Sequence, residues 1–142
     1  MTENIINDIK KILEKHKLEI IVADRNKING SGMVVVSDIC SFIAIANDLA
    51  PALKTFVLLH ELGHICLNYM THSSNFNYGD EIEKECDLWA IHFLDQVLEK
   101  RTLNKLIYLA DQQGELYDYI SKSYEFDKLY KDCRTSFFKN ES

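Results

Sequence analysis

The chain has 142 residues, of which 46% are hydrophobic, and its formal net charge is −6. This length and apolar content suit one globular domain over residues 1–142 and argue against an intrinsically disordered chain. The acidic balance disfavours direct nucleic-acid binding, because the sixteen Lys and Arg residues are spread among acids rather than gathered in a patch.

The longest apolar runs are too short to span a membrane. Met33–Val36 and Phe42–Ala46 fall far below the roughly 20 residues that a spanning helix needs. No charged-then-apolar leader opens the chain, since residues 1–17 alternate Ile and Leu with polar residues. We therefore expect a cytoplasmic protein with no membrane contact.

The cysteines would be reduced thiols in that compartment. None of them forms the C-x-x-C pair that is typical of a structural zinc site. They are Cys40, Cys66, Cys86 and Cys133. We interpret Cys66 and Cys86, which lie beside the motifs described below, as small buried apolar residues.

The first half of the chain predicts one helix and three strands. Ile and Leu recur at helical spacing over residues 3–16, which indicates an amphipathic helix. Three short apolar stretches follow, at Leu18–Ala23, Met33–Val36 and Ser41–Ala46, and turn residues such as Asn29-Gly30 separate them. Successive strands with tight connections favour an antiparallel meander, so we expect a small three-stranded, mainly antiparallel sheet.

The second half of the chain predicts helices. Asp48 or a neighbour would cap a central helix from about residue 53 to 69, with Pro51 in its first turn. A polar loop follows over residues 71–79. Three further helices are predicted at residues 80–98, 102–120 (loosened at 112–114) and 124–138. The expected fold class is therefore α+β.

His60-Glu61-Leu62-Gly63-His64 is a complete H-E-x-x-H sequence inside the apolar run of the central helix. Side chains four apart on a helix lie one above the other, so His60 and His64 can point at one metal ion. Three protein ligands and one open position form a catalytic zinc site. Glu61 lies about 100° round the helix from His60, where its carboxylate can take a proton from the attacking water.

The H-E-x-x-H pattern also has a simpler explanation, which is chance occurrence among buried core residues. Chance alone would produce the pattern in roughly one such chain per hundred, and a single buried histidine is usually a core residue. Three polar side chains on a helix otherwise rich in Phe, Val, Leu and Ile are harder to explain by packing, because their uncompensated burial would cost several kcal/mol. Gly63 costs about 1 kcal/mol relative to Ala, which is tolerable where a neighbouring backbone or a substrate comes close.

A third metal ligand has to come from another part of the chain. Leu67 and Met70 occupy the positions of the Gly and the third His in an H-E-x-x-H-x-x-G-x-x-H pattern, which excludes the metzincin arrangement. The helix at 80–98 offers acids instead, as in sites with two His and one Glu. Glu83 and Asp87 share a face of it, so Glu83 can bind the metal while Asp87 accepts a hydrogen bond from the outer nitrogen of a ligand imidazole.

These acids also have a local explanation. Acidic residues in the first turn of a helix favour its dipole, and Asp80 with Glu83 fits a capping box that would use Glu83 locally. Spacing favours Glu83 as the ligand and leaves Glu81 and Glu85 open. His92 lies about 180° from Glu83 around the helix and is left out of the site.

Three stretches of the chain form a larger pattern. A predicted strand ends in Ile-Ala-Ile-Ala-Asn47, and the central helix then carries Thr55-Phe-Val-Leu-Leu-His-Glu-Leu-Gly-His64. The next helix carries Glu83-Lys-Glu-Cys-Asp-Leu-Trp-Ala90. Together these stretches resemble the ImmA/IrrE family of zinc metallopeptidases. The resemblance covers about residues 18–98, ahead of C-terminal helices at about 102–138. The chain departs from the family pattern at Cys86 and Trp89, where Ala and Phe are usual, and it lacks a Leu-Leu-Met-Pro ending after the second motif.

The resemblance implies a gluzincin-like α+β fold with one zinc ion per chain, held by His60, His64 and Glu83. It also implies Glu61 as the base and Asp87 beside a ligand imidazole. Known members are cytosolic bacterial or phage proteins that cleave a helix-turn-helix repressor. The resemblance thus implies a zinc-dependent endopeptidase with a DNA-binding repressor as its protein substrate, although the departures leave the substrate open.

Other residues and other functions remain as hypotheses. Tyr69, His72 and Tyr78 are candidates for holding the oxyanion or contacting substrate, and each is also explained as an ordinary surface or core residue. A zinc-containing protein could instead bind a repressor or antitoxin without cutting it, although such a protein would not need Glu61. A helical scaffold without zinc is the third hypothesis, and metal content would distinguish it.

Overall fold

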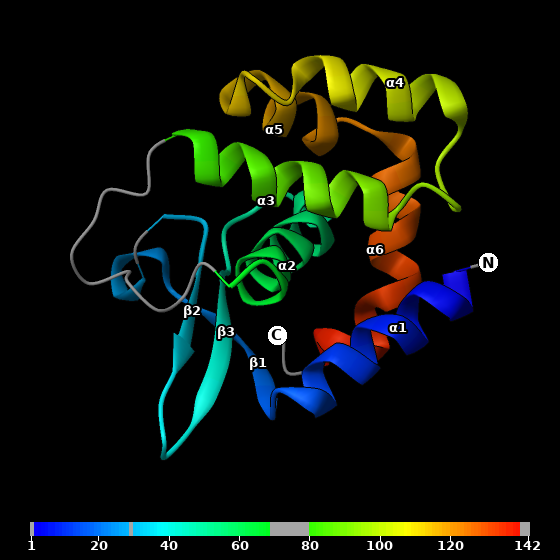
Figure 1. Cartoon of the computed structure of the whole chain (residues 1–142). Coiled ribbons are helices and arrows are strands. Elements are labelled where there is room, and N and C mark those ends of the chain that lie inside the picture. Colours follow the sequence, from blue (N-terminus) through cyan, green and yellow to red (C-terminus); the bar gives the residue numbers. More distant parts are fainter. Residues whose placement is uncertain (1, 29, 69–79, 140–142) are drawn as a thin grey trace.

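The computed structural model describes residues 2–28, 30–68 and 80–139. Its elements in chain order are α1 (Thr2–Lys15), β1 (Leu18–Ala23), the short 3-10 helix η1 (Arg25–Lys27), β2 (Gly32–Val36), β3 (Ser41–Ala46), α2 (Pro51–Cys66), α3 (Asp80–Phe93), α4 (Lys100–Leu109), α5 (Gln113–Ser121) and α6 (Tyr124–Phe137) (Figure 1). A three-stranded sheet packs against α2, and the expected α+β class is confirmed. No helix in these ranges has both the length and the apolar character needed to cross a bilayer.

The sheet is mixed, and the predicted meander is wrong. β3 lies in the centre, with β1 parallel to it on one side and β2 antiparallel to it on the other. Residues Ile43–Ala46 of β3 are all buried, whereas β1 and β2 are largely half-buried or exposed. The most buried strand takes the centre because only the central strand has neighbours along both edges. A hairpin at Asn29-Gly30 would have made β1 and β2 neighbours, which they are not.

The connection from β1 to β2 crosses the end of β3 and is held there by polar contacts. Asn47 Nδ2 donates a hydrogen bond to Asp24 Oδ1 at 2.8 Å, and Arg25 forms an ion pair with Asp48 at 2.9 Å. The sequence predicts Asp48 or a neighbour as the cap of the central helix, and these contacts explain why Asp48 itself does not cap it. Asp48 faces Arg25, and the N-cap of α2 is Ala50, which makes no side-chain hydrogen bond.

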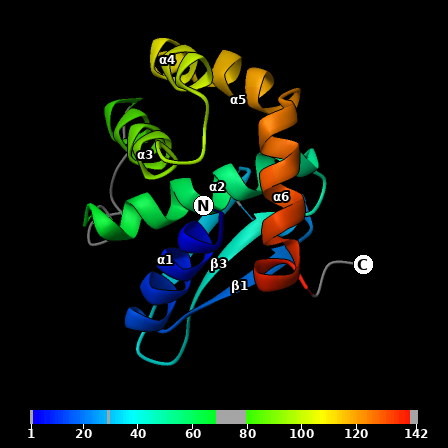
Figure 2. The same cartoon turned by 90° about the vertical axis from the view of Figure 1, so that its right-hand side faces the viewer.

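Helix α2 is buried on every side. It begins at Pro51, as predicted for its first turn, and every residue from Ala52 to Ile65 is buried. The helix contacts α3, α5 and α6 as well as β2 and β3 (Figures 1 and 2). It ends at Cys66, just before Asn68, whose φ of +61° is a left-handed conformation that ends helices. The end predicted at residue 69 lies outside the described residues.

The contact between α2 and α3 depends on Gly63. A Cβ at this position would lie 3.3 Å from the backbone oxygen of Cys86 and 3.4 Å from Cε3 of Trp89. The close approach of a neighbouring backbone, one of the two reasons predicted for Gly63, is therefore present. Cys86 is buried, as expected, whereas Cys66, the last residue of α2, is exposed, so its interpretation as a buried residue is wrong.

The predicted helix over 102–120 is in fact two helices, α4 and α5. They meet at a corner where Leu109 and Ala110 are buried, and Gly114 lies just beyond it, in the stretch predicted to be loosened. The turn lets α5 pack back against α2. At the start of α6, Ser123 accepts a hydrogen bond from the backbone nitrogen of Phe126 at 3.3 Å, a standard N-cap.

Candidate metal centre

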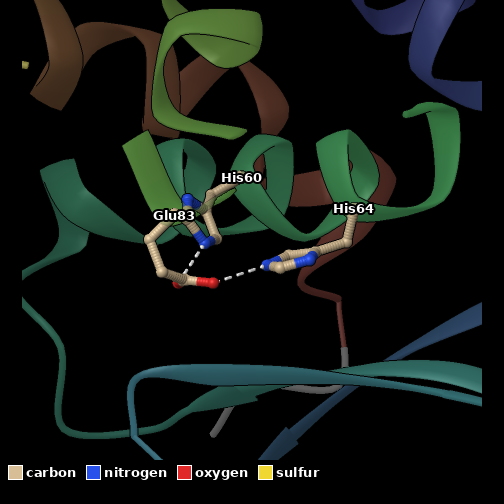
Figure 3. Close-up of side chains that lie close together, drawn as sticks. All are labelled: His60, His64 and Glu83. Carbon is tan, nitrogen blue, oxygen red and sulfur yellow. Dashed lines mark hydrogen bonds and ion pairs between the residues drawn. The ribbon is translucent and has the colours of Figure 1, made fainter. Parts of the chain in front are cut away.

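Three side chains from two helices converge on one point. His60 and His64 project from successive turns of α2, and Glu83 projects from the first turn of α3 (Figure 3). One ligand atom from each side chain lies within 4.8 Å of the other two. Glu83 Oε1 is 3.0 Å from Nε2 of His60, and Oε2 is 3.1 Å from Nε2 of His64. Two imidazoles and one carboxylate are a donor set that binds zinc in catalytic sites.

The outer nitrogen of His60 faces a second carboxylate. Nδ1 lies 2.7 Å from Oδ1 of Asp87, which is fully buried. An ionised carboxylate only accepts hydrogen bonds, so Nδ1–H donates, and Nε2 is directed at the position shared with His64 and Glu83. Burial lowers the pKa of His60, but its hydrogen bonds with Asp87 and Glu83 outweigh burial and raise that pKa to about 10.

Glu83 is held in its ionised form. Burial raises its pKa, but hydrogen bonds with the two imidazoles outweigh burial and bring the pKa down to about 2. Its carboxylate faces the imidazoles, so the capping-box explanation does not describe where this side chain lies. Glu81 and Glu85 are exposed and lie outside the three-residue cluster, as does His92.

Glu61 is buried next to the cluster. Burial raises its pKa, and the nearby imidazoles of His60 and His64 lower it in part, so the pKa stays above its usual range. A carboxyl group with a raised pKa is suited to taking up and returning a proton near neutral pH. A Cβ on Gly32 at the start of β2 would lie 3.2 Å from Glu61 Oε2. We did not predict this contact from the sequence, since its only sign there is a glycine beside a predicted strand.

Helix α5 contributes two side chains that sequence reasoning missed. Gln113 Nε2 donates to Asp87 Oδ2 at 2.8 Å, and the hydroxyl of Tyr117 donates to Asp87 Oδ1 at 3.1 Å. Burial and the charge of Asp87 raise the pKa of Tyr117 well above its usual value, so the hydroxyl keeps its proton. No motif links these residues to Asp87, because they lie 26 and 30 positions away in the chain.

The remaining candidates, Tyr69, His72 and Tyr78, lie outside the described residues. Their contact with a substrate or an oxyanion stays a prediction. Within the described residues, the cluster that can hold a metal ion therefore consists of His60, His64 and Glu83, with Asp87 behind His60 and Glu61 beside it.

Comparison with known proteins identifies the family. The family Peptidase_M78, described as the IrrE N-terminal-like domain, matches residues 13–125. The matched region contains both motifs and extends through α5. Comparisons with curated proteins and with solved structures found no match. The resemblance drawn from the two motifs is confirmed, and the chain belongs to the Peptidase_M78 family, the metallopeptidases with the IrrE N-terminal-like domain.

Proposed function

We propose that the protein is a zinc-dependent endopeptidase that hydrolyses a peptide bond in a protein substrate. The observation that carries the proposal is the convergence of His60, His64 and Glu83 beside the buried carboxylate of Glu61. The donor set fits zinc, because imidazole nitrogens and one carboxylate oxygen are among its usual ligands in catalytic sites. Membership of a metallopeptidase family supports the reaction class.

Each residue of the centre then has a role. His60 and His64 would hold the ion through Nε2, and Glu83 through its carboxylate. When bound, zinc supplies a Lewis acid that polarises the scissile carbonyl and lowers the pKa of water to about 7. Glu61 would take the proton from the attacking water and return it to the leaving amine. Asp87 would hold the ring of His60 in place through Nδ1–H.

The edge of β2 offers a substrate a place beside Glu61. In the part of the chain that the structure describes, β2 pairs with β3 along one edge only. An unpaired strand edge can take up an extended peptide through backbone hydrogen bonds. Gly32 begins this strand and lies against Val57 and Glu61 of α2, so a peptide along the edge would pass Glu61. An extended protein segment fits this edge.

We propose a DNA-binding repressor of the helix-turn-helix type as the substrate. The family resemblance supports it, and the net charge of −6 suits a basic protein partner better than nucleic acid itself. Such a substrate places the reaction in the cytoplasm.

The test pairs zinc content with cleavage of the protein encoded next to this one. The parent should hold about one zinc per chain and cut that protein. Glu61→Gln should keep its zinc and lose cleavage by about 100-fold or more, because it removes the proton acceptor alone. His60→Ala should lose both zinc and cleavage. Glu81→Gln, an exposed acid on α3 outside the cluster, is the matched control and should behave like the parent.

Other results of these zinc and cleavage measurements would favour a different mechanism or a different function. Cleavage by Glu61→Gln at the parental rate would remove Glu61 from the mechanism. Stoichiometric zinc with capture of the repressor and no cleavage would favour a protein that binds a repressor or antitoxin without cutting it. Absence of zinc even after reconstitution would leave the zinc-free scaffold.

A further inference from the structure

Two side chains of helix α5 donate hydrogen bonds to Asp87, next to the candidate metal centre. We propose that Tyr117 and Gln113 are positioning residues, whose hydrogen bonds hold Asp87 in the orientation that fixes His60 for the metal. This proposal rests on the function proposed above, because it requires a metal ion bound by His60. Neither residue belongs to the H-E-x-x-H motif or to the acidic motif of α3.

The two α5 residues occupy both oxygens of Asp87. Oδ1 accepts from Nδ1 of His60 at 2.7 Å and from the Tyr117 hydroxyl at 3.1 Å, while Oδ2 accepts from Nε2 of Gln113 at 2.8 Å. Gln113 Nε2 also lies 3.3 Å from the Tyr117 hydroxyl oxygen. The carboxylate therefore cannot turn about its own bond without breaking a hydrogen bond on each oxygen.

The two donors from α5 are important because the carboxylate that accepts their hydrogen bonds is buried. Asp87 is fully buried, and a buried carboxylate is costly unless hydrogen bonds compensate for the lost water. Without the α5 donors, the Asp87 carboxylate would be free to rotate, and Nδ1–H of His60 would lose a fixed acceptor. The imidazole of His60 would then have a less defined ring orientation. Partners of this kind tune metal affinity because they orient the ligand and raise its basicity.

Packing alone does not account for the two polar groups. The ring of Tyr117 packs edge-on against Phe56 of α2, with centroids 5.7 Å apart, and this contact involves the ring rather than the hydroxyl. Gln113 is exposed overall, so it contributes little to the core. The hydroxyl and the amide can therefore be removed while the ring packing stays.

The test is the zinc affinity of the full chain, measured by competition with a chelator. Tyr117→Phe and Gln113→Ala should each weaken zinc binding about three- to tenfold, and the double variant by up to about 100-fold, in the range seen when partners of metal-ligating histidines are removed. Tyr119→Phe, on the same helix but outside this hydrogen-bond network, is the matched control and should bind zinc like the parent. Thermal unfolding in excess chelator checks that each variant folds.

A second measurement separates positioning from a structural role. In an Asp87→Asn background, Tyr117→Phe should weaken zinc binding much less than it does in the parent, since its effect acts through the Asp87 carboxylate. The proposal would be overturned if Tyr117→Phe lowered zinc affinity equally in both backgrounds. It would also be overturned if the Tyr117→Phe/Gln113→Ala double variant kept the parental zinc affinity. A parent that binds no zinc would instead overturn the proposed function, and this proposal with it. Failure of the proposed function is thus seen in the parent itself, whereas failure of this proposal alone is seen only when the variants are compared with a zinc-binding parent.

Discussion

At the scale of single residues, the buried imidazoles of the candidate metal centre are paired with carboxylates. His60, Glu61 and His64 are each at least nine-tenths buried on a helix that is otherwise apolar. Such burial costs several kcal/mol unless the groups are paired, and the imidazoles are paired with Glu83 and, for His60, with Asp87. Thr55, one and a half turns before His60, differs: among the described residues its hydroxyl has no hydrogen-bond partner.

This difference predicts opposite effects for one substitution at two buried threonines. Thr55→Val should raise the free energy of unfolding by up to about 1 kcal/mol, because it removes an unsatisfied hydroxyl. Thr102→Val should lower it by about 1 kcal/mol, since the Thr102 hydroxyl donates to Glu125. Urea unfolding of both variants measures the effect. A larger loss for Thr55→Val than for Thr102→Val would contradict the assignment of Thr55 as unsatisfied.

At the scale of elements, two glycines let other elements come close to α2. Gly63 brings the backbone of α3 against α2 between His60 and His64, and so brings Glu83 within reach of both imidazoles. Gly32 does the same for β2, at the side of the helix where Glu61 lies. The spacing of the centre is therefore set by backbone approach as well as by the ligands.

Alanine at the two glycines should affect different steps. A Cβ on Gly63 would meet backbone atoms of Cys86 at 3.3 and 3.4 Å, so Gly63→Ala should push α3 away and weaken zinc binding about tenfold or more. A Cβ on Gly32 would lie 2.8 Å from Cγ1 of Val57 and 3.2 Å from Oε2 of Glu61. Gly32→Ala should therefore keep zinc and lose cleavage by about tenfold or more, because it displaces the proposed base.

Gly114 provides the control for both variants. A Cβ there would meet nothing within 4 Å, so Gly114→Ala should stabilise α5 by up to about 1 kcal/mol and leave zinc affinity and cleavage unchanged. Zinc titration, peptide cleavage and thermal unfolding of the three variants are the measurements. If Gly63→Ala and Gly114→Ala gave the same gain in stability with unchanged zinc affinity, the packing argument at Gly63 would fail.

At the scale of the whole molecule, the loaded and metal-free proteins should respond differently to pH. Burial lowers the pKa of His60, but hydrogen bonds with Asp87 and Glu83 raise that pKa to about 10 in the folded chain, from an ordinary value of 6.5. A raised pKa stabilises the folded state fully below pH 6.5, and this contribution is lost as the pH rises toward 10. If His60 binds zinc as proposed, zinc would take the neutral imidazole and its binding would release the proton, so zinc affinity should rise over the same interval.

We therefore expect the Tm of the metal-free protein to fall by a few degrees between pH 6.5 and 9, while the gap between loaded and metal-free Tm widens. Thermal unfolding with excess zinc and with excess chelator, at several pH values, measures both. His60→Gln should show neither trend, because it removes the titrating group. If the Tm of the zinc-bound protein and the Tm of the metal-free protein changed in parallel with pH across this interval, His60 would not couple zinc binding to pH.

Local features could be predicted from the amino-acid sequence: α1, the three strand segments, the apolar helix with its H-E-x-x-H motif, and the family. Periodicity and i, i+4 spacing depend on neighbouring residues, so they can be recognised without a fold. The strand order, the corner between α4 and α5, and the contacts of Asp87 with Gln113 and Tyr117 could be seen only in the folded chain. These depend on which buried strand takes the centre and on how distant helices pack, and no local pattern in the chain encodes that choice.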